Sequence, residues 1–113
     1  MKTKTFKDLI VWQKSKRLAI KVYRLTDDFP KSELYGLTNQ MRRAAISISS
    51  NIAESYHRFQ VKEKRQFLRI AFGSGSELES QLDVARELFP GLKYDEAESL
   101  LVEVMKLLNF FLK

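Results

Sequence analysis

The residues best placed to do chemistry in this chain are a glutamate and a histidine three positions apart. Glu54-Ser55-Tyr56-His57 has the Glu-x-x-His spacing that puts two ligands on one helix face in di-iron bundles. Those sites need two such motifs and a glutamate from each of two further helices, whereas His57 is the only histidine of the sequence. We therefore expect no metal and no other cofactor, and we interpret His57, beside Arg58, as a solvated residue at a helix end.

Other catalytic arrangements lack the residues that they need. The 113 residues include no cysteine, which removes disulfides and thiolate chemistry and fits a reducing cytoplasm. With one histidine, the serines have almost no base to activate them. Gly73 and Gly75 fall inside a predicted helix with no strand before it, so they form no phosphate-binding loop. The sequence predicts a protein that is not an enzyme.

The distribution of charge is more informative than any motif. The chain has 20 Lys/Arg against 14 Asp/Glu, and residues 1–31, with nine Lys/Arg and three Asp/Glu, hold the whole excess of +6. One group of cations recurs along the first segment at spacings of three, four and three, and a second surrounds the joint near residue 60. The first is Lys14, Arg17, Lys21 and Arg24; the second is Arg58, Lys62, Lys64, Arg65 and Arg69. Such groups suit phosphate contacts, and a solvated face that keeps the protein soluble is the alternative.

Four segments of helical periodicity must position these side chains. They cover about residues 7–28, residues 34 or 38 to 56, residues 62–88 and residues 95–113. Their apolar stripes run from Val11 to Phe29, from Leu34 to Tyr56, from Leu68 to Phe89 and from Ala97 to Phe111. The third stripe has a seven-residue repeat, which predicts packing at a small crossing angle. We predict one domain over residues 1–113, an all-α, antiparallel up-down-up-down four-helix bundle.

Several local features refine this prediction. Ser32 and Thr38 are rival N-caps for the second helix, and Asp95 with Glu98 resembles a capping box for the fourth. Gly73 and Gly75 cost helix stability, which close approach of another backbone would offset; the small residues 44–53 are the natural neighbour, and a local kink is the alternative.

Polar residues beside the stripes predict contacts between helices. We expect Arg42 or Arg43 to pair with Glu77 or Glu54 across the second and third helices, and we expect Asn51 to be half-buried with a hydrogen-bond partner.

A second apolar stripe on the first helix consists of Trp12, Ala19 and Tyr23. It caps the edge of the core, or it meets another subunit, since aromatic residues are enriched in interfaces. The longest strictly apolar run, Leu9 to Trp12, is far short of the roughly 20 residues that span a bilayer, so no membrane passage is expected.

The chain resembles a known family over nearly its whole length. The segments that carry the resemblance are Asp8-Leu9-Ile10-Val11-Trp12-Gln13-Lys14, Phe29-Pro30, residues 35–45 (YGLTNQMRRAA), Ser50-Asn51-Ile52-Ala53-Glu54 and residues 77–82 (ELESQL). Together they look like the four-helix bundle proteins encoded by intervening sequences of bacterial 23S ribosomal RNA genes. Two positions depart from that pattern, since Ser49 stands where the family usually has Pro and Ser55 where it has Gly.

The resemblance implies assembly as well as fold. The family implies a ring-like homopentamer, which favours Trp12, Ala19 and Tyr23 as residues that face another subunit. Related accessory proteins of diversity-generating retroelements imply contact with nucleic acid and a reverse transcriptase through a basic surface. No enzymatic activity is attached to either group.

We therefore expect a non-enzymatic cytoplasmic oligomer that binds RNA or DNA without reading its sequence. The cations expected to present the positive surface are Lys14, Arg17, Lys21, Arg24, Arg42, Arg43, Arg58, Lys62 and Arg65. The rival hypothesis is a scaffold for a protein partner, in which the charges serve only solubility. A first helix whose lysines and arginines are neutralised by neighbouring acids would refute the nucleic-acid hypothesis.

Overall fold

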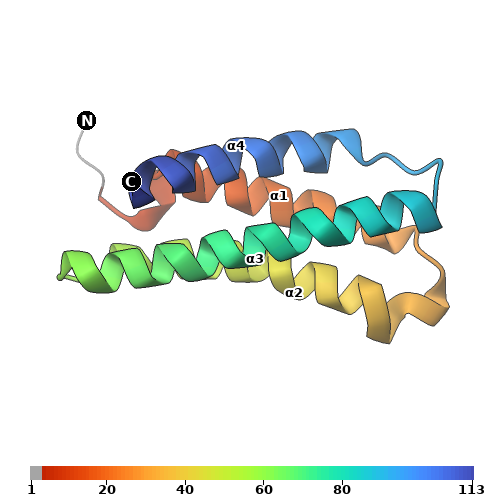
Figure 1. Ribbon diagram of the computed structural model, residues 1–113, viewed down its shortest axis with the longest axis horizontal. Helices are drawn as coiled ribbons and strands as arrows, with labels where there is room; N and C mark the ends of the chain where they lie inside the picture. Colours follow the sequence, from red (N-terminus) through yellow and green to blue (C-terminus); the bar gives the residue numbers. More distant parts are fainter. Residues whose placement is uncertain (1–3) are drawn as a thin grey trace.

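Four helices carry the apolar stripes of the sequence and enclose one core (Figure 1). The computed structural model describes residues 4–113, and in that range they are α1 (Ile10–Asp27), α2 (Asn39–Tyr56), α3 (Val61–Leu88) and α4 (Asp95–Leu112). Three short helical turns, η1 (Phe6–Asp8), η2 (Lys31–Glu33) and η3 (Leu34–Thr38), precede α1 and α2. The predicted all-α, up-down-up-down four-helix bundle is confirmed. Residues 1–3, which the predicted domain included, lie outside the described residues.

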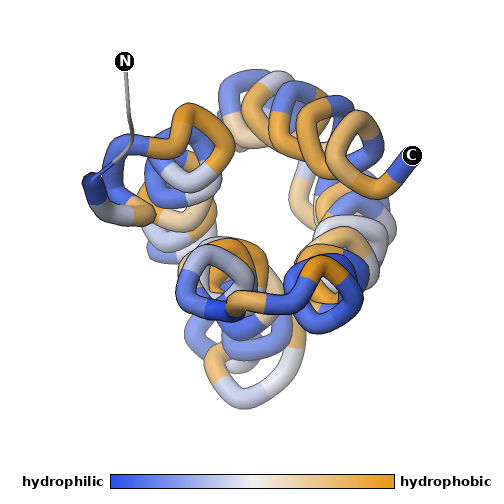
Figure 2. The backbone as a smooth tube through the Cα atoms, turned by 90° about the vertical axis from the view of Figure 1, so that its left-hand side faces the viewer, coloured by the Kyte–Doolittle hydropathy of each residue, from blue (hydrophilic) through white to orange (hydrophobic). Residues whose placement is uncertain are grey.

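The helices form a square in cross-section (Figure 2). α1 packs against α2 and α4, and α3 packs against the same two helices, so α1 and α3 are diagonal neighbours. Heptad-spaced positions of all four stripes are fully or nearly fully buried, among them Leu18, Ile48, Leu78 and Val104 at 0% exposure. The bundle measures 43 × 24 × 21 Å, and α3, with 28 residues, is long enough to span it, at about 1.5 Å per residue.

Two ion pairs show the register of α1 and α4. Lys14 pairs with Glu103 and Lys21 with Glu96, seven residues apart on both helices. This antiparallel register places the last turn of α4 beyond the first residue of α1. Phe111 is therefore 45% exposed, and the prediction that it continues the buried stripe is wrong.

The connection from α1 to α2 is a tight series of turns. Phe29 is buried and Pro30 ends the helical path, as predicted. Gly36, with φ −112° and ψ −113°, interrupts η3, so α2 begins only at Asn39 and Leu34 is 46% exposed rather than part of the core. Of the two rival N-caps, Thr38 stands at the N-cap position of α2, but its side chain makes no capping hydrogen bond; in the preceding turn the backbone N–H of Leu37 donates to the Glu33 carboxylate.

The two glycines of α3 differ in their surroundings. A Cβ on Gly75 would overlap the Met105 side chain of α4, whereas one on Gly73 would meet no atom within 4 Å. The close approach at Gly75 therefore involves a side chain of α4 and not the backbone of α2. The small face of α2 does meet α3 next to it, where Ser74 Oγ donates to Ser47 Oγ at 2.8 Å.

The connection from α3 to α4 is fastened by Tyr94. Its side chain is 2% exposed, and its hydroxyl lies 2.9 Å from the carbonyl oxygen of Ala85 and 2.8 Å from that of Phe89. The predicted capping box is wrong, because the carboxylates of Asp95 and Glu98 accept hydrogen bonds from Arg86 of α3 instead.

Candidate nucleic-acid interface

The predicted cationic stripe of α1 is half neutralised. Lys14 is paired with Glu103, and Lys21 Nζ lies 2.5 Å from a Glu96 carboxylate oxygen. The hydrogen bond from Lys21 lowers the pKa of the Glu96 carboxyl. The prediction that all four stripe cations face outward and free is therefore wrong. Arg17 and Arg24 are exposed and make no ion pair within residues 4–113.

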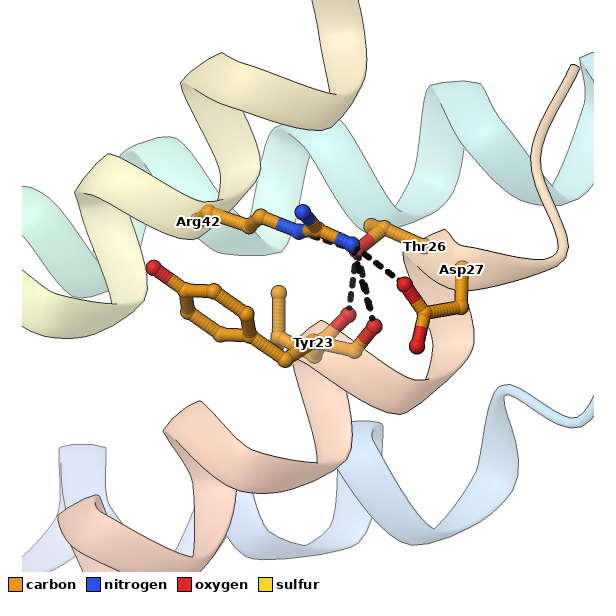
Figure 3. A network of polar contacts seen from close by, with 5 residues as sticks. Tyr23, Thr26, Asp27 and Arg42 are labelled. Carbon is orange, nitrogen blue, oxygen red and sulfur yellow. Dashed lines mark hydrogen bonds and ion pairs between the residues drawn. The ribbon is translucent and has the colours of Figure 1, made fainter. Parts of the chain in front are cut away.

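Arg42 joins α2 to α1 rather than presenting charge to solvent (Figure 3). Its Nε donates to Thr26 Oγ1 at 2.8 Å and its Nη2 to Asp27 Oδ1 at 2.9 Å. The same Nη2 donates to the Tyr23 carbonyl oxygen at 3.3 Å, and the guanidinium lies 4.6 Å from the centre of the Tyr23 ring. The side chain is only 21% exposed. The predicted pairing with Glu77 or Glu54 is wrong, and the contacts with α1 engage the guanidinium predicted to bind nucleic acid.

The remaining partners of that predicted pairing lie apart. Glu54 Oε2 accepts a hydrogen bond from Arg58 on its own helix at 2.9 Å. Arg43 is exposed and lines a shallow depression between α2 and α3 together with Glu77 and Gln81, without an ion pair. Asn51 is half-buried and donates to the Ser47 carbonyl oxygen at 2.8 Å, as expected.

The cations around the α2–α3 turn are partly structural. Lys64 Nζ donates to the carbonyl oxygens of Ser55 and Tyr56 at the end of α2, each at 3.3 Å. Arg65 Nη2 donates to the Leu112 carbonyl oxygen at 2.6 Å, at the end of α4. Positive charge at a helix C-terminus complements the helix dipole, so both side chains stabilise the bundle while adding charge to this end.

Lys62 and Arg69 are the free members of this group. Both are exposed, and neither makes an ion pair within the described part of the chain. Arg58 is held in place by Glu54 and by the Phe67 ring, whose centre lies 4.6 Å from its guanidinium carbon.

The structure separates charge along the long axis of the bundle. The half that contains the α2–α3 turn and the end of α4 consists of residues 4–17, 50–70 and 100–113, and we call it the basic half. It holds 12 Lys/Arg against four Asp/Glu, a side-chain charge of +8. The acidic half, residues 18–49 and 71–99, holds seven Lys/Arg against ten Asp/Glu, a charge of −3. Sequence sums by segment missed this separation, because every helix runs through both halves.

The second apolar stripe of α1 is only partly on the surface. Ala19 is 6% exposed within the chain's own core, so the prediction that it faces another subunit is wrong. Trp12 is half-buried, with its ring 5.1 Å from the Phe6 ring. Tyr23 is 41% exposed beside Arg42. Of the three, Tyr23 is the one that the bundle leaves most open.

Sequence reasoning did not single out the most exposed aromatic side chain of the described residues. Phe59, in the turn between α2 and α3, is 99% exposed. The signal was present in the sequence, because this residue lies outside both neighbouring apolar stripes and in a short joint rich in cations.

The Glu54-His57 pair assembles no metal site. His57 is exposed at the end of α2, with its ring 5.9 Å from that of Phe6, and Glu54 is engaged by Arg58. Among residues 4–113, no three His, Cys, Asp or Glu side chains gather as metal ligands would. In the same range, no helix has the length and apolar character needed to cross a membrane.

Comparisons with known proteins point to one family. The model of the 23S rRNA-intervening sequence protein family matches residues 7–110. A crystal structure of a protein of unknown function from the S23 ribosomal protein family of Bacteroides thetaiotaomicron is similar, with a TM-score of 0.81 and 22% sequence identity. The match covers 92% of this chain and 99% of that one. A comparison with curated proteins gave no match.

Proposed function

The chain belongs to the 23S rRNA-intervening sequence protein family, and from this premise we propose that it is a non-enzymatic bundle that binds RNA or DNA through its basic half. The observation that carries the proposal is the charge separation, with +8 in one half and −3 in the other. A polyanion attracts the basic half and repels the acidic half, so binding is oriented. Contacts with phosphates release counterions, and they read no sequence.

The exposed cations of this surface include only Arg17 from the predicted stripe on α1. Lys62 and Arg69 of α3 and Arg17 of α1 are exposed and without ion pairs in the described chain. Arg58 and Arg65 add charge while they hold the turn and the end of α4 in place. Because the cations come from several helix ends and one turn, the surface suits a phosphate backbone better than the edges of bases.

Salt-dependent binding tests the proposal. We expect mixed-sequence RNA to bind the intact protein with an affinity that falls steeply with salt. The double variant Lys62→Glu/Arg69→Glu should reduce the slope of log affinity against log salt by about 1.4–1.8, if each residue contacts one phosphate. No detectable binding at about 50 mM salt would refute the proposal.

A matched control lies in the acidic half. Lys31→Glu/Lys93→Glu changes the net charge of the chain by the same amount, and both residues are exposed. This variant should keep the slope of the unchanged protein. An equal loss in the two double variants would mean that net charge, and not the basic half, governs binding.

We also propose that copies of this chain associate. A groove of about 830 Å³ runs between α3 and α4, with Phe72, Met105 and Val102 among its lining and Glu79 and Asp83 at its edge. On the opposite side of the square, α1 and α2 expose Tyr23 and Ile46 beside Arg43. The two faces are complementary in charge and both partly apolar. A contact between unlike faces is head-to-tail and closes into a ring when the rotation allows.

Substitution within the groove tests this association. Val102 is 52% exposed and lines the groove, whereas Val84 is 46% exposed on α3 outside it. Val102→Arg should convert an oligomer to monomers in light scattering, and Val84→Arg should not. A monomeric parent protein would refute the association.

A protein partner that stays bound after Lys62→Glu/Arg69→Glu would favour the rival hypothesis, in which the chain is a scaffold and its charges serve only solubility.

A further inference from the structure

Phe59 is exposed to an extent that the fold does not explain. Its side chain is 99% exposed, although phenylalanine gains stability when it leaves water. It contributes nothing to the packing of either neighbouring helix. An aromatic side chain in this position is therefore suited to contact with another molecule.

The structure places this side chain at the far tip of the bundle. α3 has 28 residues and α4 has 18, and the bond from Arg65 to the Leu112 carbonyl oxygen sets the end of α4 one turn inside the start of α3. The turn between α2 and α3 therefore stands beyond the end of α4 (Figure 1). Phe59 can be approached from several directions.

Hydrogen bonds order the backbone of the turn that carries Phe59, whereas the Phe59 ring packs against none of the described residues. The backbone N–H groups of His57 and Arg58 donate to the carbonyl oxygens of Glu54 and Ser55, each at 3.2 Å. Lys64 holds two carbonyl oxygens of the same helix end. Because the backbone of the turn is already ordered, only the side-chain torsions of Phe59 lose freedom when its ring stacks on a partner.

The surroundings of Phe59 are cationic. Arg58 precedes it, Lys62 follows three residues later, and the half to which it belongs carries a charge of +8. An anionic partner with flat apolar faces fits both properties. Unpaired nucleotides have both, whereas the bases of a duplex are already stacked on their neighbours.

We propose that Phe59 is a stacking platform for an unpaired base, and that the basic half therefore prefers single-stranded nucleic acid to duplex. This inference rests on the proposed function and adds the class of nucleic acid and the residue that selects it. Lys62 and Arg69 contact the phosphates of the strand whose base lies on Phe59.

Binding of a mixed-sequence single strand, as RNA and as DNA, and of each strand annealed to its complement tests the proposal. Phe59→Ala should weaken single-strand binding about 5- to 150-fold and leave duplex binding unchanged. Phe59→Trp should retain the single-strand affinity, because an indole ring also stacks. Equal wild-type affinity for single strand and duplex would overturn the proposal.

The control is an equally exposed aromatic residue at the other end. Tyr35 lies in η3 within the acidic half and is 91% exposed, so Tyr35→Ala should change neither affinity. Neither residue supports the core, and thermal unfolding of both variants should match the parent protein.

The outcomes separate this inference from the proposed function. Unchanged single-strand binding in Phe59→Ala, with a loss in Lys62→Glu/Arg69→Glu, refutes the stacking platform and leaves the proposed function standing. Absence of binding to any nucleic acid refutes both. If Phe59→Ala instead abolishes binding to vesicles of anionic phospholipid and leaves single-strand binding intact, Phe59 contacts a lipid surface and the proposal is overturned.

Discussion

Replacing the two central glycines of α3 by alanine, one at a time, should stabilise the bundle at Gly73 and not at Gly75. Gly73 has open space where a Cβ would stand, so Gly73→Ala gains helix propensity, about 0.5–1 kcal/mol. Gly75→Ala makes the same gain, but its Cβ displaces the Sδ end of the flexible, half-buried Met105 side chain, and the cost reaches about 1–3 kcal/mol only where the neighbouring side chains resist that displacement. With that resistance, the net effect at Gly75 is a loss of about 0–2.5 kcal/mol.

Thermal unfolding followed by far-UV circular dichroism measures the difference. At roughly 4 °C per kcal/mol for a chain of this size, Gly73→Ala should raise Tm by roughly 2–4 °C and Gly75→Ala should lower it by up to roughly 10 °C. In a Met105→Ala background the penalty at Gly75 should disappear, since the overlapping atoms are gone. Equal stabilisation by both alanines in the parent protein would contradict the close packing of α3 on α4.

Three further predictions concern single side chains. Arg42→Ala should lower stability by about 1–3 kcal/mol in urea unfolding, because it removes charged hydrogen bonds between α1 and α2, whereas exposed Arg43→Ala should stay within about 0.5 kcal/mol. Tyr94→Phe should lower the free energy of unfolding by about 0.5–1.5 kcal/mol, because it removes the buried hydroxyl and its hydrogen bonds. Burial raises the pKa of Tyr94, so the parent protein should lose stability above about pH 10, where the hydroxyl ionises in the unfolded chain. Tyr94→Phe should lack this loss of stability at high pH. Lys21→Met should raise the pKa of Glu96 toward its ordinary value in an NMR titration, and an unchanged pKa would argue against their hydrogen bond.

The helices could be predicted because burial dictates their periodicity. The seven-residue repeat from Leu68 to Phe89 predicted a helix through that segment and its packing at a small angle to its neighbours, and α3 runs alongside the other helices in Figure 1. Chain reversals were less predictable, because they depend on side chains from distant helices. Arg86 takes the carboxylates that would have capped α4, and no local pattern reveals that competition.

The sequence predicted a cationic surface but not which lysines and arginines form it. The helical spacing of Lys14 and Lys21 shows that they share a face but does not show which acids oppose it. One signal was available, since Glu96 and Glu103 have the same seven-residue separation. Arg42 was indistinguishable in sequence from the exposed Arg43 beside it, because only the position of α1 decides which one becomes buried.

The separation of charge along the long axis of the bundle has a geometric consequence for any cyclic assembly. Symmetry makes all copies equivalent, so rods that stand parallel to a rotation axis all point the same way. Every positive tip would then gather on one rim of the ring and every negative tip on the other. One face of such a ring would be positively charged and would expose one Phe59 from each copy along the path of a bound nucleic-acid strand.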